Sequence, residues 1–144
     1  MRKIGIQVTI IYVDEGLIEF QVRASNGRFA GQAELYAPLE ILAEFAGVLR
    51  GFPTSHTDTR KFELGTFDEA YGGGGVSFHF YCIDSLGHAM AKVKFRDDSR
   101  RWLGAIDVAD FHISVEAAAI DSFTGELEKI ISVVGQTAFL DGID

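Results

Sequence analysis

Hydrophobic and polar residues alternate with a period of two through the first third of the chain, which is the pattern of a β-strand with one buried face. Two turn signals divide this region. DEG at 14–16 ends in glycine and fits a three-residue hairpin loop with a glycine bulge, and Asn26-Gly27 fits a two-residue type I′ turn. We therefore predict a three-stranded antiparallel meander with one apolar face, which includes Ile4, Ile6, Val8, Ile10, Ile18, Phe20, Val22, Ala24, Ala33 and Leu35.

The two turns also predict which residues face each other across the strands. The Asn26-Gly27 turn sets Phe20 opposite Ala33, which keeps the apolar face continuous. On the other face the same register sets Glu19 opposite Glu34, a like-charge pair that is tolerable only in water. We therefore expect this second face to be exposed. The remaining predicted pairs are Val8 with Val22, Ile10 with Phe20 and Tyr12 with Ile18 around DEG, and Ala24 with Phe29 and Ile18 with Leu35 around Asn26-Gly27.

The apolar period changes to that of a helix in two places. Residues 38–50 carry one apolar stripe, with Pro38 suited to the first helical position and Gly51 suited to the C-terminal cap. Residues from about 120 to 134 show the same period, with Asp121 as the N-cap. We predict one helix in each segment.

Residues 71–95 contain four consecutive glycines, two histidines and the only cysteine of the chain. A phosphate-binding glycine loop must lead into a helix, whereas this glycine run leads into the alternating sequence VSFHFYCI. We therefore predict a loop followed by a strand. DSLG at 84–87 fits a four-residue hairpin loop. The register that this loop sets places Cys82 on the apolar face, so we predict that Cys82 is a small buried residue whose thiol pKa is raised. The predicted pairs are Val76 with Phe95, Phe78 with Val93, Phe80 with Ala91, Cys82 with Ala89 and, on the other face, His79 with Lys92.

These elements indicate an α+β fold. Alternating runs at 62–67 and 108–118 add two further strands. We predict about seven mainly antiparallel strands in one curved sheet or a partly open β-sandwich, with the two helices covering the apolar faces. The length of 144 residues fits a single globular domain at 1–144, with disorder expected only in LDGID at 140–144.

No motif for catalysis, metal binding or cofactor binding is found in the sequence. His79 and His88 lie about 13 Å apart along the predicted hairpin, too far to share a metal ion. The chain has no G-x-S-x-G, H-E-x-x-H or C-x-x-C sequence. We predict no catalytic residue, no metal and no cofactor, and an active site assembled from distant residues stays open as an alternative.

The formal net charge is −8, and the basic residues concentrate at 92–101. This balance disfavours nucleic acid as a partner and favours a basic protein, although a charge of this size also serves solubility alone. One cysteine cannot form an internal disulfide, and no apolar run approaches the ~20 residues that span a bilayer. We therefore predict a cytoplasmic protein without membrane contact.

Five residues are candidates for contact with a partner. Glu19 and Glu34 lie on the exposed face of the meander, Asp68 and Glu69 lie in a polar loop, and Trp102 lies in the basic segment. Tryptophan is common at the centre of protein interfaces. A lone tryptophan in a small domain more often fills a corner of the core or covers a sheet edge, so we expect Trp102 to be covered.

The second half of the chain resembles a family of short uncharacterised bacterial proteins related to polymorphic-toxin immunity proteins. The matching pieces run from about residue 35 to 131 and are LEILAEFAGVLRGF, FELG, VSFHFYCIDSLGHAMAKVKF, the lone tryptophan and FHISVEAAAIDSFTGEL. The resemblance implies a non-enzymatic, immunity-like domain that binds and blocks a cognate bacterial toxin. It supplies no catalytic residue and no mapped interface.

Three hypotheses for function follow. The leading one is protein binding of the immunity type, with a basic toxin as partner. The second is a small-ligand-binding or enzymatic domain with an aromatic-lined pocket in the curved sheet, which convergent polar groups with shifted pKa values would favour. The third is a homo-oligomeric structural domain that associates through exposed strand edges.

Overall fold

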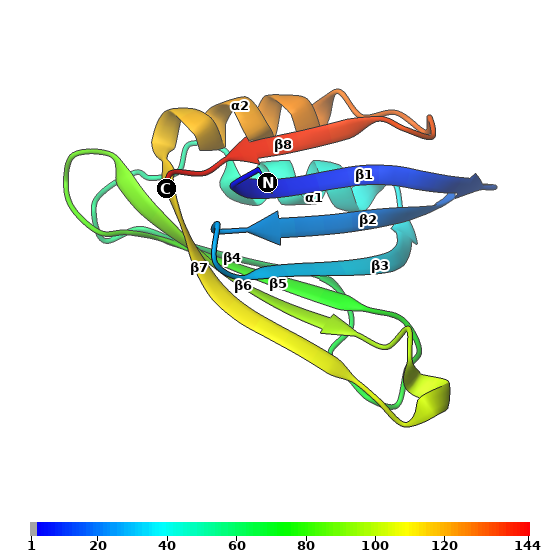
Figure 1. Cartoon of the computed structure of the whole chain (residues 1–144). Coiled ribbons are helices and arrows are strands. Elements are labelled where there is room, and N and C mark those ends of the chain that lie inside the picture. The colour runs from blue at the N-terminus through cyan, green and yellow to red at the C-terminus, as the bar shows by residue number, and fades with distance from the viewer. Residues whose placement is uncertain (1–2) are drawn as a thin grey trace.

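The computed structural model describes residues 3–144, which form two four-stranded antiparallel sheets and two α-helices (Figure 1). Sheet A has the strand order β3-β2-β1-β8, and sheet B has the order β4-β5-β6-β7. The α+β prediction is confirmed, with the strands divided between two sheets. The elements are β1 (Gly5–Asp14), β2 (Leu17–Ser25), β3 (Ala30–Pro38), α1 (Glu40–Leu49), β4 (Thr59–Gly65), β5 (Gly75–Cys82), β6 (His88–Asp97), the 3-10 turn η1 (Arg101–Leu103), β7 (Asp107–Glu116), α2 (Ala117–Glu128) and β8 (Thr137–Asp141).

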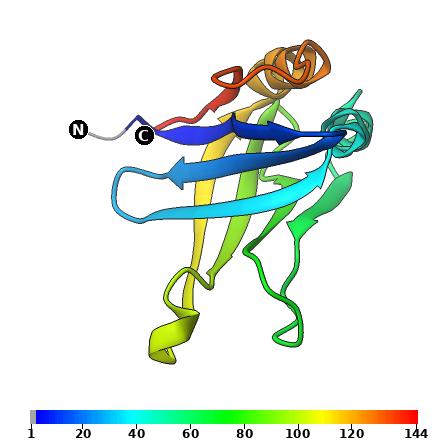
Figure 2. The same ribbon diagram turned by 90° about the vertical axis from the view of Figure 1, so that its right-hand side faces the viewer.

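The two sheets pack face to face at one side only. β3 contacts all four strands of sheet B, whereas α2 contacts β8 and β7, and α1 contacts α2 and β4. In Figure 1 the helices lie behind β8 and β1, and sheet B passes behind β3. The view in Figure 2 shows the same arrangement from the side, with the strands of sheet B running down and away from sheet A. The helices thus fill the space where the sheets separate.

One continuous cluster of buried side chains joins both sheets and both helices. Phe45 of α1 lies at its centre, with ring centroids 4.8 Å from Phe62 and 4.8 Å from Phe78 of sheet B. The ring of Phe123 in α2 meets Phe45 edge-on at 5.7 Å. Burial of one such side chain stabilises the fold by about 1.5–3 kcal/mol, so this aromatic group is a main source of stability.

The register predicted for the β5–β6 hairpin is confirmed at every pair, from Val76 with Phe95 to Cys82 with Ala89. The two turns of the first meander differ from the prediction. The first loop has two residues, Glu15 and Gly16, both with positive φ, because the extra residue sits in β1 as an irregularity between Ile10 and Tyr12. Tyr12 therefore faces Glu19 instead of Ile18 and is 52% exposed.

The second turn is a four-residue loop, not the predicted two-residue turn. Ser25 pairs with Ala30, and Asn26 Oδ1 accepts hydrogen bonds from the backbone N–H groups of Arg28 at 2.9 Å and Phe29 at 2.8 Å. The Asn26 side chain thus provides the hydrogen-bond acceptor for two backbone N–H groups of this wider loop. The pairing of β2 with β3 is therefore shifted by two residues from the prediction. Because side chains alternate between the two faces, the same residues still form the apolar face. The predicted pairing of Glu19 with Glu34 is wrong. The observed pairs are Phe20 with Leu35, Glu19 with Tyr36 and Gln21 with Glu34.

The helices also begin and end differently from the prediction. α1 begins at Glu40 because Pro38 is still the last residue of β3. α2 follows β7 directly and begins with three alanines, the best helix formers, so Asp121 lies inside the helix and is not its N-cap. α2 ends at Glu128, and the following residues turn back toward β1.

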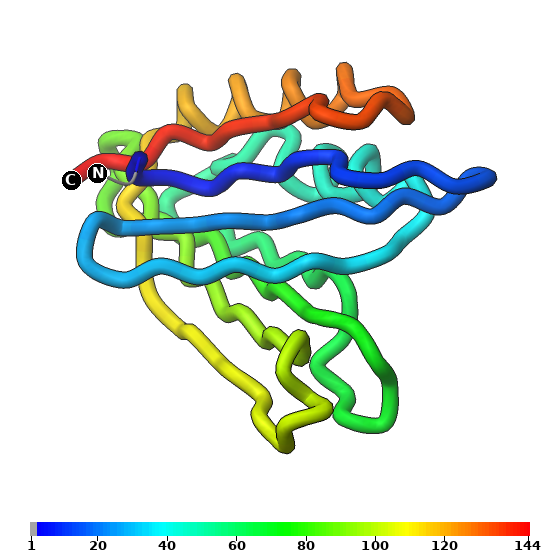
Figure 3. The backbone as a smooth tube through the Cα atoms, turned by 45° about the vertical axis from the view of Figure 1, so that its right-hand side comes forward, coloured from blue at the N-terminus to red at the C-terminus, as the bar shows by residue number. Residues whose placement is uncertain are grey.

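The end of the chain is ordered, contrary to the expected disorder at 140–144. β8 lies beside β1 and pairs with it (Figure 3). Leu140 of this strand is completely buried. Beyond the strand, the Ile143 N–H donates to the Ser114 carbonyl of β7 at 2.8 Å. This five-residue strand is too short to show a clear period, so the sequence pattern did not predict it.

Candidate functional site

Three of the five candidate residues lie on two neighbouring loops at one end of sheet B. Asp68 and Glu69 lie in the β4–β5 loop, and Trp102 lies in η1 of the β6–β7 loop. Both loops project together from the body of the molecule, as Figures 1 and 3 show. We call residues 66–74 and 98–106 the loop tip. Glu19 and Glu34 belong instead to the outer face of sheet A.

Hydrogen bonds hold the two loops of the loop tip together. Arg96, which is only 3% exposed, donates from Nη1 to the Gly73 carbonyl at 2.8 Å, and the Gly73 N–H donates to Asp98 Oδ2 at 2.7 Å. Arg101 donates from Nη2 to the Glu69 carbonyl at 2.9 Å and from Nη1 to the Tyr71 carbonyl at 3.3 Å. The β4–β5 loop is therefore fixed by side chains of the β6–β7 connection.

The four glycines at 72–75 also help to hold the β4–β5 loop in place. A Cβ on Gly75 would lie 2.3 Å from the Thr66 carbonyl oxygen, and a Cβ on Gly74 would lie 3.0 Å from the Glu34 carbonyl oxygen. Gly73 has φ +107°, a conformation that side chains rarely adopt. Close contacts or a positive φ thus explain why three of these four positions are glycine. The arrangement agrees with the prediction of a loop that leads into a strand.

Trp102 is exposed, so the expectation that it would be covered is wrong. Its exposed fraction is 81%, and those of Leu103 and Tyr71 are 62% and 65%. Arg101 turns toward the β4–β5 loop, and the left-handed Gly104 ends the 3-10 turn. Trp102 and Leu103 consequently face solvent from a fixed backbone, a placement that no periodic pattern around residue 102 predicts.

The charges of the loop tip are not evenly neutralised. Arg100 forms an ion pair with Asp107, and Arg101 lies 4.0 Å from Asp98. Asp68 and Glu69 take part in no ion pair among residues 3–144. The two arginines of the loop tip thus have carboxylate partners, in Asp107 at the start of β7 and in Asp98, while two exposed carboxylates stand beside the exposed aromatic groups.

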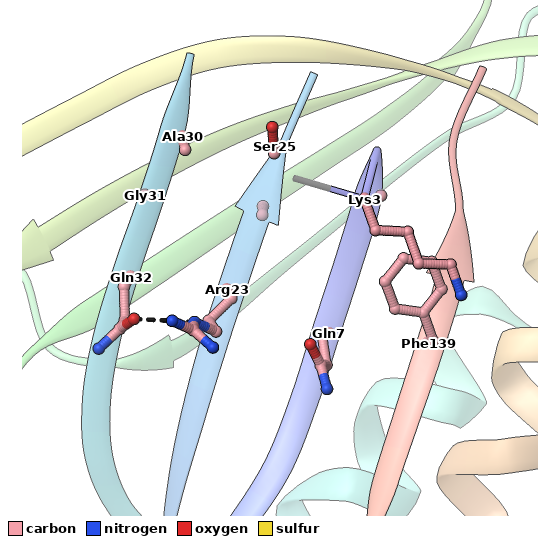
Figure 4. A pocket seen from close by; sticks show the side chains of 10 residues that line it. Lys3, Gln7, Arg23, Ser25, Ala30, Gly31, Gln32 and Phe139 are labelled. Carbon is pink, nitrogen blue, oxygen red and sulfur yellow. Dashed lines mark hydrogen bonds between the residues drawn. The ribbon is translucent and has the colours of Figure 1, made fainter. Parts of the chain in front are cut away.

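A shallow hollow of about 450 Å³ lies on the outer face of sheet A (Figure 4). Arg23 Nε donates to Gln32 Oε1 at 2.8 Å on one side, and the Lys3 ammonium lies 3.9 Å from the centre of the Phe139 ring on the other. Its ten lining residues include no carboxylate, imidazole or thiol. The hollow therefore has no pair of groups suited to acid–base or thiol chemistry.

Cys82 behaves as predicted for a thiol that is not activated. It is partly buried, and its Sγ lies 3.7 Å from the Ser55 carbonyl oxygen. Burial, with further contributions from Asp58 and Asp84, raises the pKa of this thiol, so the reactive thiolate is disfavoured. Among residues 3–144, no group of three or more potential ligand side chains is placed to hold a metal ion.

Comparisons with known proteins add no relative. No family model, no curated protein and no solved structure matches the chain. Within the part of the chain that the structure describes, no helix is long and apolar enough to cross a membrane.

Proposed function

We propose that this chain is a non-enzymatic protein-binding domain and that the loop tip is its contact surface. The observation that carries the proposal is the exposure of Trp102, Leu103 and Tyr71 on loops that are fixed by hydrogen bonds. Tryptophan and tyrosine supply much of the binding energy at protein interfaces. A backbone that is already ordered loses less conformational entropy on binding, which favours affinity.

The charge of the loop tip favours a basic partner. Asp68 and Glu69 are exposed and unpaired among the described residues, whereas the neighbouring Arg100 has its own carboxylate partner. Carboxylates at the rim of an aromatic contact attract a cationic surface and orient it during the encounter. The net charge of −8 acts in the same direction at longer range.

The finer proposal is that the partner is a bacterial toxin that the chain neutralises in the cytoplasm. The resemblance of residues 35–131 to immunity-related proteins supports it. An acidic surface that carries an aromatic anchor suits the cationic substrate groove of a nuclease toxin. The single free cysteine is compatible with a reducing compartment.

Affinity capture with matched variants tests this proposal. The tagged chain is incubated with lysate of its source organism and washed in steps of increasing salt, in parallel with a Trp102→Ala, Leu103→Ala variant. We expect one basic protein, retained in stoichiometric amount by the original chain and lost from the variant. The control is Leu86→Ala, which removes a side chain that is 79% exposed in the β5–β6 loop.

Charge reversal separates the loop tip from sheet A. Asp68→Lys with Glu69→Lys should slow association with the captured partner, most strongly at low salt. Glu19→Lys with Glu34→Lys changes the charge equally on the outer face of sheet A and should have the smaller effect. The proposal is wrong if the partner binds all variants alike, or if the retained protein is a second copy of this chain.

A further inference from the structure

A row of basic side chains crosses all four strands of sheet B on its outer face. Lys61 of β4 lies opposite His79 of β5, His79 lies opposite Lys92 of β6, and Lys92 lies opposite His112 of β7. Side chains directly opposite each other in a sheet have Cβ atoms about 4.5–5.5 Å apart. The row therefore places the ammonium groups of Lys61 and Lys92 on either side of one imidazole, that of His79, in a chain of net charge −8.

Part of the row lines a hollow of about 490 Å³, separate from the loop tip. Lys61, His79 and Lys92 line it together with Lys94 and with two carboxylates, Glu63 and Asp110. Only one of the three lysines that line the hollow forms an ion pair among the described residues. Lys92 Nζ lies 3.9 Å from Asp110 Oδ2, and neither Lys61 nor Lys94 forms an ion pair within residues 3–144.

His79, which lines the hollow, has a ring nitrogen that makes no hydrogen bond within residues 3–144. Its Nε2 is covered from solvent and has no hydrogen-bond partner among the described residues, and its ring lies 5.3 Å from the ring of Tyr81. Burial, then the charges of Lys61 and Lys92, lower the pKa of His79. A covered polar atom without a partner reduces stability, and most such atoms in proteins have a partner.

We propose that this hollow binds a compact, multiply charged oxyanion, the phosphate group of a small molecule, between Lys61 and Lys92. The oxyanion supplies acceptors to both ammonium groups and to the His79 imidazole, and its charge offsets the repulsion between the two ammonium groups. The lysine side chains extend into solvent and can move to admit it. Glu63 and Asp110 also line the hollow and repel a long polyanion, so a single compact group placed between the two lysines fits better than a nucleic acid.

Nuclear magnetic resonance of the histidine side chains, with inorganic pyrophosphate as the probe, tests this site on the isolated chain. The chain has four histidines, and His56 and His88 serve as internal references outside the row. We expect saturable shifts at His79 and His112 and a rise in the pKa of His79, because a nearby negative charge favours its protonated form. The measurement needs no protein partner, so its result is independent of the function proposed for the loop tip.

Variants decide whether the row itself binds the anion. Lys61→Gln with Lys92→Gln should weaken pyrophosphate binding by about tenfold or more, because each lysine provides a charge-assisted hydrogen bond. Lys129→Gln, at an exposed position next to α2, is the matched control and should bind as the original chain does. Both lysines of the row are exposed, so the double variant is expected to fold. Small, non-saturating shifts at all four histidines, or unchanged affinity in the double variant, would overturn the proposal.

Discussion

The two ends of sheet B are closed in different ways. At one end, the β5–β6 loop is held mainly by its own residues, because Asp84 accepts a hydrogen bond from the Leu86 N–H at 2.7 Å and lies 2.6 Å from His88 Nδ1. One backbone hydrogen bond, from the Ala117 N–H to the Gly87 carbonyl at 3.1 Å, ties this loop to α2. At the other end, the loop tip is held by four hydrogen bonds between residues that are 23 to 32 positions apart in the sequence.

This difference determines what each end can present to a partner. The β5–β6 loop exposes two large apolar side chains, Ile83 and Leu86, both from one short chain segment. The loop tip exposes four large apolar side chains, Tyr71, Trp102, Leu103 and Ile106, from two chain segments whose relative position is fixed. Anchoring by another part of the fold lets a loop keep its shape while its own side chains face solvent. The proposed function therefore places the contact surface at the loop tip and not at the hairpin end.

Alanine at two glycines should distinguish the ends most strongly. Gly75→Ala places a Cβ 2.3 Å from a backbone oxygen at the base of the loop tip and should lower the free energy of unfolding by about 3 kcal/mol. The Cβ of Gly87→Ala in the β5–β6 loop meets no atom within 4 Å. Only the positive φ of this position opposes alanine, so the free energy of unfolding should fall by about 1 kcal/mol. Urea unfolding measures both values.

The matched control for this pair is Gly125→Ala in α2. This position also has open space, and its φ is not positive, so alanine should raise stability by up to about 1 kcal/mol through helix propensity. Equal losses at Gly75 and Gly87 would show that the loop tip is no more closely packed than the hairpin loop.

A smaller effect should appear in the pH dependence of the hairpin end. The hydrogen bond to Asp84 raises the pKa of His88, and the same contact lowers the pKa of Asp84. His88 then adds stability below its unfolded pKa of about 6.5 and loses it as pH rises through the raised value. Asp84 adds stability above about pH 3.9 and loses it as pH falls through the lowered value. The pair therefore stabilises most between these limits.

Asp84→Asn should return the pKa of His88 toward its ordinary value, with only the weaker effect of Glu116 left to raise it. Proton resonance titration of the imidazole measures this directly, and His79 on β5 provides an unaffected reference. Binding of the captured partner should not change, because the substitution lies far from the loop tip along sheet B. A pKa of His88 that stays raised in the variant would show that Asp84 is not its cause.

The sequence predicts the core of this fold better than its connections. A register error of two residues at Asn26 leaves the same side chains buried, because strand faces repeat every two residues. The same error misplaces Glu34 relative to Glu19, since charged positions on the outer face have no packing constraint. The side chain of Asn26 accepts two loop N–H groups, and this interaction is not visible in a turn dipeptide.

For the loop tip, the sequence indicates the candidate residues but not that they lie close together. Asp68, Glu69 and Trp102 could be selected as exposed or unusual residue types, but their proximity depends on Arg96 and Arg101, which bond to carbonyl oxygens of the other loop. Backbone acceptors leave no signature in the sequence. The basic row on sheet B was accessible in part, because the predicted β5–β6 register already set His79 opposite Lys92.

Fluorine resonance of Trp102 tests the central claim most directly. The chain has one tryptophan, so labelling with 5-fluorotryptophan gives a single fluorine signal that reports the loop tip. In the free chain this signal should shift between water and heavy water, because the indole is exposed to solvent. In the saturated complex with the captured partner, we predict that the signal moves and loses this solvent shift. A saturated complex in which the Trp102 signal keeps its position and its solvent shift would contradict the assignment of the loop tip as the contact surface.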